Sequence, residues 1–167
     1  HENFFFSLFK ILKRIPQTKV RVLDVAKTYD NAKIPVECYT DKFDAILPAL
    51  IQEIEKTTTD IKRVYVINGV SKLKSKINEN TYPIYEKFFR AIKESENTIA
   101  IIADNESDYQ RLELETWYDE VINKHRGIWL GEDVGNQLAI RVDNIDPEIR
   151  NQSFPDMAFI LDETTVI

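Results

Sequence analysis

The sequence predicts an α/β protein with a mostly parallel central sheet, and three segments carry that prediction. Residues 64–67 are four consecutive apolar residues, and residues 99–103 form a second apolar run. Such runs are typical of parallel strands that are buried on both faces. Between them, residues 82–93 place aromatic and aliphatic side chains at helical spacing. The order strand, helix, strand indicates a crossover unit, which is how neighbouring parallel strands are joined.

The composition is that of a folded, acidic protein. The chain has 167 residues, of which 43% are hydrophobic and 30% are charged, and we expect one domain over residues 1–167. A net charge of -6 and a pI near 5.1 argue against general nucleic-acid binding, because neutralising phosphates requires a basic surface. No apolar run approaches the length needed to cross a bilayer, so we expect no direct membrane insertion of this chain.

Cysteine and histidine are too few and too scattered to suggest a metal centre. Cys38 is the single cysteine, and the two histidines are His1 and His125. We therefore expect no disulfide within the chain and no metal site built from these ligands.

The first third of the chain predicts a helix, two strands and a second helix. Apolar residues recur at helical spacing over residues 4–12, and residues 19–25 read as a strand that ends near Asp24. Residues 36–39 suit a short strand, and residues 43–54 an amphipathic helix. Asp24 would either contact a ligand at the sheet edge or cap its own loop.

The middle of the chain repeats the strand and helix alternation. The strand at residues 64–68 is followed by the polar, lysine-rich segment 71–80, which we expect to be a solvated face or a contact for an acidic partner. The helix at residues 82–93 leads to the strand at residues 98–103, which ends in Asp104 and Asn105. These two residues would either touch a ligand or form a turn.

The last part of the chain changes character. A helix from residue 107 or 108 to about residue 123 is expected to place Trp117 in the core. Short strands are then predicted over residues 127–131, 137–142 and 157–161, separated by turn-rich connections.

The end of the predicted central strand is the main candidate for chemistry. Nucleotide hydrolases with such a sheet place an acidic residue there to hold Mg²⁺ through water, often beside a second carboxylate that orients the attacking water. The two positions are Asn68 and Gly69 in this chain. An amide binds a hard cation less well than a carboxylate and cannot act as a base, and glycine offers no side chain. The sequence therefore predicts the frame of an ATPase without its catalytic acids.

Three passages carry a resemblance to a known family. They are VYVINGVSKL at residues 64–73, the long passage from YPIYEKFF to WYDEVI at residues 82–122, and GIWLGEDVGNQLAIRV at residues 127–142. Together they resemble the carboxyl-terminal FtsK/SpoIIIE-type ATPase domain of type VII secretion motor proteins. The resemblance implies a RecA-like fold of the P-loop NTPase type, a three-layer sandwich that lacks its first strand here and is truncated at the N-terminus as a fragment of a larger multidomain chain.

The resemblance also implies positions for the nucleotide motifs. Asn68 and Gly69 would be a degenerate Walker B position, and Asp24, Asp104 and Asn105 would lie near a nucleotide. His1, which is either native or the remnant of a tag, would stand with its neighbour Glu2 where active members have lysine and threonine. We expect no catalytic residue, and binding of ATP and Mg²⁺ that is weak or absent.

The function implied by the resemblance is recognition of substrates or regulation of export, in a cytoplasmic domain of a cell-membrane protein. Its partners would be other ATPase domains of the same chain and the small helical proteins that such a system secretes. Trp129 is a candidate for partner binding, because exposed tryptophans often anchor interfaces, although it is equally well explained as a core residue.

Two other functions remain open from the sequence. A working ATPase could be completed by residues outside these 167 or by a neighbouring subunit. A nucleotide or phosphate receptor of the flavodoxin-like or receiver type would need a phosphate-binding loop or clustered acids after the first strand. Only Asp24 could serve as such an acid, and the four glycines of the chain leave little for a phosphate-binding loop.

Overall fold

The computed structural model describes residues 2–29, 33–56, 60–143, 145–150, 157–162 and 165–166. The chain divides into two compact units, His1–Val121 and Ile122–Ile167, and each is described by itself below. One domain over residues 1–167 stays a prediction.

The first unit is built on a parallel sheet. Its strands are β1 (Thr18–Asp24), β2 (Glu37–Tyr39), β3 (Lys62–Asn68) and β4 (Thr98–Ala103), in the order β2-β1-β3-β4 with every pair parallel. This confirms the predicted α/β class and the central position of the strand that ends at Asn68. The same order is that of the first four strands of flavodoxin-like sheets. The sheet therefore does not establish a RecA-like fold, which stays a prediction.

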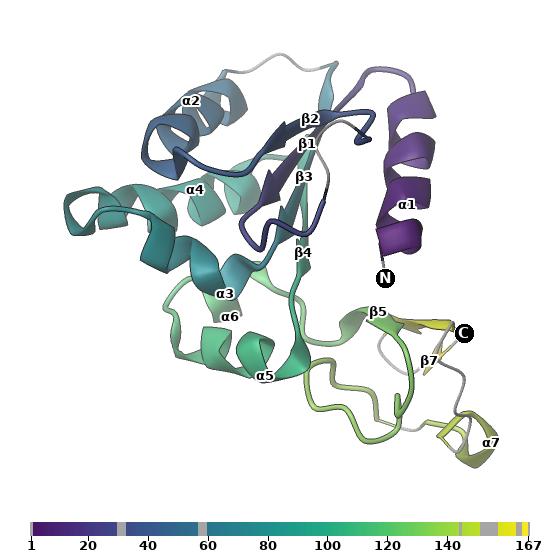
Figure 1. Ribbon diagram of the computed structural model, residues 1–167. Coiled ribbons are helices and arrows are strands. Elements are labelled where there is room, and N and C mark those ends of the chain that lie inside the picture. The colour runs from purple at the N-terminus through teal and green to yellow at the C-terminus, as the bar shows by residue number, and fades with distance from the viewer. Residues whose placement is uncertain are drawn as a thin grey trace. The chain divides into compact units, whose positions relative to one another are not determined.

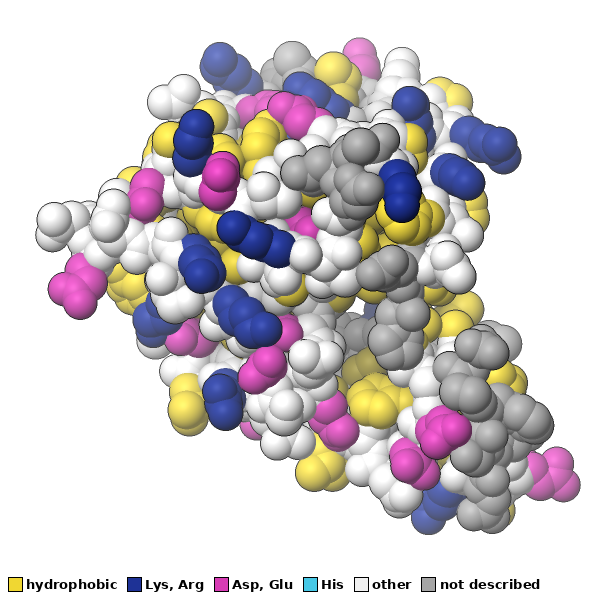
Figure 2. Space-filling model, in the orientation of Figure 1, with side chains coloured by type: hydrophobic (Ala, Val, Ile, Leu, Met, Phe, Trp, Pro, Cys, Tyr) yellow, Lys and Arg dark blue, Asp and Glu magenta, His cyan; other side chains and the backbone are white. Residues whose placement is uncertain are grey.

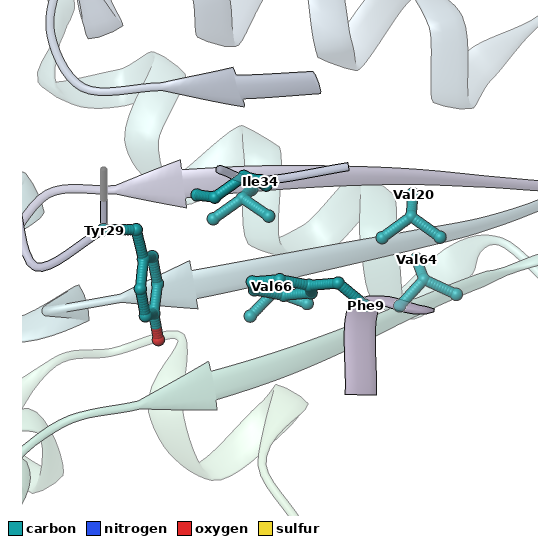
Figure 3. Packing of buried hydrophobic residues seen from close by; sticks show 7 residues of the cluster. Phe9, Val20, Tyr29, Ile34, Val64 and Val66 are labelled. Atoms are coloured by element: carbon teal, nitrogen blue, oxygen red, sulfur yellow. The ribbon is translucent and has the colours of Figure 1, made fainter. Parts of the chain in front are cut away.

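Helices lie on both faces of this sheet. Helices α2 (Phe43–Glu55) and α4 (Tyr82–Glu94) pack together on one side, and α1 (Glu2–Arg14) lies on the other (Figure 1). Beneath α1, side chains of β1 and β3 that point to the same face form one buried cluster with residues of α1 and of the loop after β1 (Figure 3). The cluster consists of Phe9, Val20, Val22, Tyr29, Ile34, Val64 and Val66. The arrangement of helix, sheet and helix is consistent with the predicted three layers.

An aromatic cluster lies at the other face. The ring of Tyr65 on β3 meets Phe88 of α4 edge to face at 5.6 Å. Phe89 of α4 stacks on Trp117 with ring centroids 3.7 Å apart and planes 7° from parallel. Trp117 is fully buried, which confirms its predicted place in the core.

The predicted helix over residues 107–123 is broken. The structure has α5 (Glu106–Tyr109), the 3₁₀ segment η3 (Gln110–Leu114) and α6 (Tyr118–Val121). The backbone at Glu115 is extended, and the Glu115 carboxylate accepts hydrogen bonds from Lys74 and Tyr82. The stack of Trp117 on Phe89 and these bonds hold the chain out of a continuous helix, because tertiary contacts outweigh helix propensity.

The lysine-rich segment is only partly a solvated face. It forms α3 (Val70–Leu73) and the 3₁₀ segments η1 (Lys74–Lys76) and η2 (Glu79–Thr81). Leu73 is fully buried and Ile77 nearly so, whereas the lysines are exposed. The buried side chains of Leu73 and Ile77 pack this segment against the rest of the first unit.

The second unit contains a small antiparallel sheet. Strands β5 (Arg126–Leu130), β6 (Ala158–Asp162) and β7 (Thr165–Val166) follow in that order, and α7 (Pro147–Arg150) is a single turn. Its core is Val134, Phe159 and Leu161, with Trp129 packed against them.

The prediction of a strand over residues 137–142 is wrong. The Gln137 side chain accepts a hydrogen bond from Ile140 N at 2.8 Å and donates one to Ile140 O at 2.6 Å. These bonds occupy the N–H and C=O groups of Ile140, which a strand would use to pair with a neighbouring strand. The segment is therefore a loop that is closed by the Gln137 side chain.

None of the helices among the described residues is long and apolar enough to span a membrane.

Candidate functional site

The candidate site lies at the carboxyl ends of β1 and β3. After β1 the chain continues to β2 on one side of the sheet, and after β3 it continues to β4 on the other side. Ligands of open parallel sheets bind at such a switch point. Asp24 and Asn68 are register partners there, so the structure brings together two of the predicted site residues.

Asp24 is completely buried and its carboxylate is occupied. Oδ1 accepts hydrogen bonds from Thr28 N at 3.1 Å and from Asn68 Nδ2 at 2.8 Å. Oδ2 accepts one from Tyr29 N at 2.8 Å. The side chain therefore caps the loop that follows β1, in the way that aspartate commonly organises turns. It presents no free oxygen toward solvent.

The backbone donors of the same loop are also occupied. The N–H groups of Val25 and Ala26 both donate to Asn68 O, at 2.9 and 3.2 Å, and Lys27 N donates to Asp24 O at 3.2 Å. With Thr28 N and Tyr29 N on the Asp24 carboxylate, each N–H from residue 25 to residue 29 has a protein acceptor. A phosphate-binding loop needs several N–H groups that converge on empty space, and residues 25–29 offer none.

Asn68 is held in one orientation by two acceptors. Its Nδ2 donates to Asp24 Oδ1 at 2.8 Å and to Thr28 Oγ1 at 2.9 Å. The amide is thus part of the link between β3 and the loop after β1. Thr28 is a member of this group that the sequence analysis missed, and its only signal was a hydroxyl four residues after an aspartate that ends a strand.

Gly69 is at a position where a side chain does not fit. Its φ is 75°, in the left-handed region. A Cβ added there would lie 2.9 Å from both Cβ and N of Ala26. The second acidic residue of a hydrolase therefore could not occupy this position unless the loop after β1 moved.

Asp104 and Asn105 belong to a separate group at the end of β4. Asp104 Oδ2 accepts a hydrogen bond from Ser71 N at 2.8 Å, and Oδ1 accepts one from Asn105 N at 3.0 Å. Asp104 thereby ties the end of β4 to the start of α3. Ser71 is a second partner that the sequence analysis did not identify.

Cys38 on β2 lies beside this network, and its thiol is unreactive at neutral pH. Burial and the nearby Asp24 charge raise the pKa of the Cys38 thiol to about 11. At neutral pH the sulfur is therefore a protonated thiol and a poor nucleophile.

A group of charges on β1, β2 and α2 lies apart from the strand ends. Arg21, which is almost fully buried, pairs with Glu37 at 2.8 Å and with Glu53 at 2.7 Å, and Lys19 pairs with Glu53 at 3.0 Å. Burial alone would raise the pKa of Glu53, but its bonds to Arg21 and Lys19 bring the pKa below its ordinary value. This group anchors α2 to β1.

A pocket of about 590 Å³ lies at the opposite, amino ends of the strands, between α2 and α4, and includes Arg63 and Arg90. The Arg63 guanidinium donates to the carbonyl oxygens of Lys56 and Ile61. Arg63 therefore caps the carboxyl end of α2. The residues that line the pocket include no predicted site residue.

The residues present at the switch point do not fit ATP with Mg²⁺. A magnesium site needs carboxylate or phosphate oxygens that face an open space. Both Asp24 oxygens, Asn68 Nδ2 and the N–H groups of residues 25–29 are instead bonded within the protein. Among the described residues, no three His, Cys, Asp or Glu side chains are grouped so that they could hold a metal ion.

The surface in Figure 2 carries both signs of charge. Lys and Arg side chains alternate with Asp and Glu side chains over this face, and neither forms a continuous stripe.

Trp129 on β5 is half-buried against the core of the second unit. Its Nε1 donates to Glu132 O at 2.8 Å. The residue is only partly buried, and its role in partner binding stays a prediction.

Comparison of the chain with protein-family models, with curated proteins and with solved structures gave no match.

Proposed function

We propose that this chain is a degenerate ATPase-like domain of a type VII secretion motor, and that it acts in recognition of substrates or regulation of export rather than in hydrolysis. One observation supports the loss of hydrolysis: at the end of β3, where such enzymes hold the metal, Asn68 Nδ2 is bonded to the Asp24 carboxylate and to Thr28 Oγ1. The resemblance of residues 64–142 to the motor family is the reason for naming the system. In this proposal the domain lies on the cytoplasmic side of a membrane-anchored chain.

The chemistry of the strand ends supports a module that does not turn over nucleotide. Hydrolysis needs a metal held opposite the phosphates and a water oriented for in-line attack. At the end of β3, Asn68 donates to Asp24 and Thr28, and a side chain at Gly69 would collide with Ala26. The network holds residues 25–29 by bonds within the protein.

Turnover of ATP by the purified protein, with and without Mg²⁺, is the first test. We expect phosphate release equal to that of a protein-free blank, in the wild type and in Asn68→Ala alike. A Mg²⁺-dependent rate that disappears on Asn68→Ala would overturn the proposal. Turnover that appears only in a longer form of the protein would support the alternative of an ATPase completed from outside these residues.

Binding to the small helical substrate proteins of such a system is the second test. We expect binding, and we expect Trp129→Ala to weaken it. Because Trp129 also packs against the core of the second unit, Phe159→Leu is the matched control, since it loosens the same core and keeps the tryptophan. Equal weakening by both variants would show that the indole itself makes no contact with the partner.

A further inference from the structure

Asn68 is followed directly by Gly69, and this is the one Asn–Gly pair in the sequence. Such a pair is chemically unstable in an unfolded chain, because the backbone nitrogen of the second residue can attack the side-chain amide of the asparagine. Glycine makes the attack easy, since it has no Cβ to shield the nitrogen and its backbone turns freely. The end of β3 therefore carries a reactivity of its own, separate from any nucleotide chemistry.

The reaction replaces the asparagine amide by a carboxylate and consumes only water. Gly69 N forms a bond to Asn68 Cγ, the Cγ–Nδ2 bond breaks, and the side-chain nitrogen leaves as ammonia with the proton that Gly69 N gives up. The resulting succinimide ring takes up water and opens at either of its carbonyl carbons. One opening gives aspartate at position 68. The other gives isoaspartate, in which the main chain runs through the side-chain carbons.

The fold holds the peptide group between Asn68 and Gly69 from both sides. Asn68 O accepts hydrogen bonds from Val25 N at 2.9 Å and from Ala26 N at 3.2 Å. Gly69 N donates to Ala103 O at 2.8 Å. The N–H of the attacking nitrogen is thus directed at β4, and turning that nitrogen toward Asn68 Cγ would break bonds to both neighbouring segments.

The amide that would leave is held as well. Asn68 Nδ2 donates to Asp24 Oδ1 at 2.8 Å and to Thr28 Oγ1 at 2.9 Å, and Asp24 is completely buried. Ring closure needs the side chain and the peptide group to rotate together, so the end of β3 must first separate from β4 and from the loop after β1. The reaction in the folded protein is therefore limited by the fraction of molecules in which this region is open.

Neither product fits the folded structure. Aspartate would place a second carboxylate beside the buried Asp24, where Asn68 Nδ2 now donates a hydrogen bond. Isoaspartate would add a carbon to the main chain before Gly69 and displace the groups that now bond to Val25, Ala26 and Ala103. Each product weakens the structure that protects the asparagine, so refolding does not reverse the change.

We propose that Asn68–Gly69 is a modification site that is closed in the folded chain and reactive in the unfolded chain, where Asn68 deamidates to aspartate or isoaspartate, and that the product lowers the stability of the folded state. The inference depends on the bonds at the end of β3, and it holds whether or not the domain belongs to a secretion motor.

The first experiment compares the whole folded chain with a free peptide of residues 64–72. Trypsin releases the same peptide from the chain, because Arg63 precedes it and Lys72 ends it. Both samples are incubated at mildly alkaline pH in water labelled with heavy oxygen, and digestion in ordinary water follows. Mass spectrometry then measures conversion at Asn68, and the label separates it from conversion during digestion.

We expect conversion in the folded chain to be at least about a hundredfold slower than in the free peptide. Unfolding the chain in urea should bring its rate close to that of the peptide. A folded chain, verified by circular dichroism, that converts as fast as the peptide would overturn the proposal.

Substitutions at two threonines test the hydrogen bonds. Thr28→Val removes an acceptor of the Asn68 amide and should raise the rate in the folded chain severalfold. Thr116→Val is the matched control, because it removes a surface hydrogen bond to Glu86 elsewhere in the first unit, and it should leave the rate unchanged. Equal rates in the wild type and in both variants would contradict protection by these bonds.

Refolding tests the effect of the product. The chain is kept unfolded in urea until conversion at Asn68 is partial, and is then diluted to the highest urea concentration at which the unmodified chain is still folded. Size-exclusion chromatography separates folded from unfolded molecules. We expect asparagine in the folded fraction and enrichment of aspartate and isoaspartate in the unfolded fraction. The same proportion of products in both fractions would overturn the claim that modification weakens the fold.

Discussion

Replacing Asn68 by Asp distinguishes a self-bonded strand end from an ATPase site that has lost an acid. In this structure Asn68 Nδ2 lies 2.8 Å from Asp24 Oδ1, and Asp24 is fully buried. Asn68→Asp replaces this donor with a second carboxyl group in the same place. In an ATPase site that has lost its acidic residue, the same change would instead restore a magnesium ligand.

The expected loss of stability is set by the smaller of two free-energy costs, the repulsion between two carboxylates and the protonation of one of them. Two ionised carboxylates separated by the present 2.8 Å would repel each other by about 6 kcal/mol at an effective dielectric constant of about 20. Keeping the introduced carboxyl protonated at pH 7 instead costs about 4 kcal/mol, from an ordinary Asp pKa of about 3.9 and about 1.4 kcal/mol per unit of pKa. Protonation is the cheaper route, so we expect Asn68→Asp to lower the free energy of unfolding by about 4 kcal/mol at pH 7.

The sign of the pH dependence follows from the same reasoning. The introduced carboxyl has a pKa in the folded variant above its unfolded value, so the variant loses stability as pH rises from about 4 toward 7. Near pH 4 the protonated carboxyl can donate to Asp24 in place of the amide, and the deficit relative to wild type should shrink to about 1 kcal/mol. Asn68→Ala is the matched control, because it removes the same hydrogen bonds and adds no titrating group.

Urea unfolding followed by circular dichroism at pH 4, 5.5 and 7, with and without Mg²⁺, measures these differences. Asn68→Ala should lose about 1–3 kcal/mol with little dependence on pH. Two results would refute the reasoning: an Asn68→Asp variant as stable as wild type at pH 7, or one that Mg²⁺ stabilises and that hydrolyses ATP.

Three further predictions concern the framework around the site. Gly69→Ala should lower the free energy of unfolding by about 1–3 kcal/mol in urea titrations, because φ is 75° and the added Cβ meets Ala26 at 2.9 Å; an unchanged midpoint would mean that the loop after β1 yields easily. Stability should fall as pH drops from about 5 to 3, because the pKa of Glu53 is lowered in the folded state by Arg21 and Lys19 despite its partial burial, and thermal melts of Glu53→Gln should show a smaller fall than those of wild type. Phe9→Ala should cost about 3–5 kcal/mol because the Phe9 side chain, on α1, is fully buried against the sheet. Ile11→Ala, at a side chain that is 59% exposed on the same helix, should stay within about 0.5 kcal/mol; similar losses in both variants would contradict the packing of α1 on the sheet.

Much of the parallel sheet was predictable because its signals are local. The run at residues 64–67 is apolar on both faces, and β3 is indeed covered by helices on both sides. The helical spacing over residues 82–93 likewise predicted a buried stripe, and Tyr85, Phe88, Phe89 and Ile92 are buried on α4, as is Ala91, which lay outside that stripe. Asp24 was correctly placed at a strand end, where the structure shows a loop cap.

The missed features depend on contacts between distant residues. Nothing within residues 107–123 marks the break at Glu115, whose partners Lys74 and Tyr82 lie more than thirty residues earlier. The loop closed by Gln137 is as rich in apolar residues as a short strand, and only the geometry of the Gln137 side chain distinguishes the two. The bond between Asn68 and Asp24 required knowledge of which strands are neighbours.

The two tryptophans, Trp117 and Trp129, fall one in each compact unit. Trp117 is fully buried in a stack against Phe89, and Trp129 is only partly buried, so their emission wavelengths should differ in the native protein. Replacing either one by phenylalanine leaves a single intrinsic fluorophore that reports on its own unit. Coincident melting curves from the two variants would mean that residues 1–167 unfold as one cooperative body, and separated curves would mean that the two units melt independently.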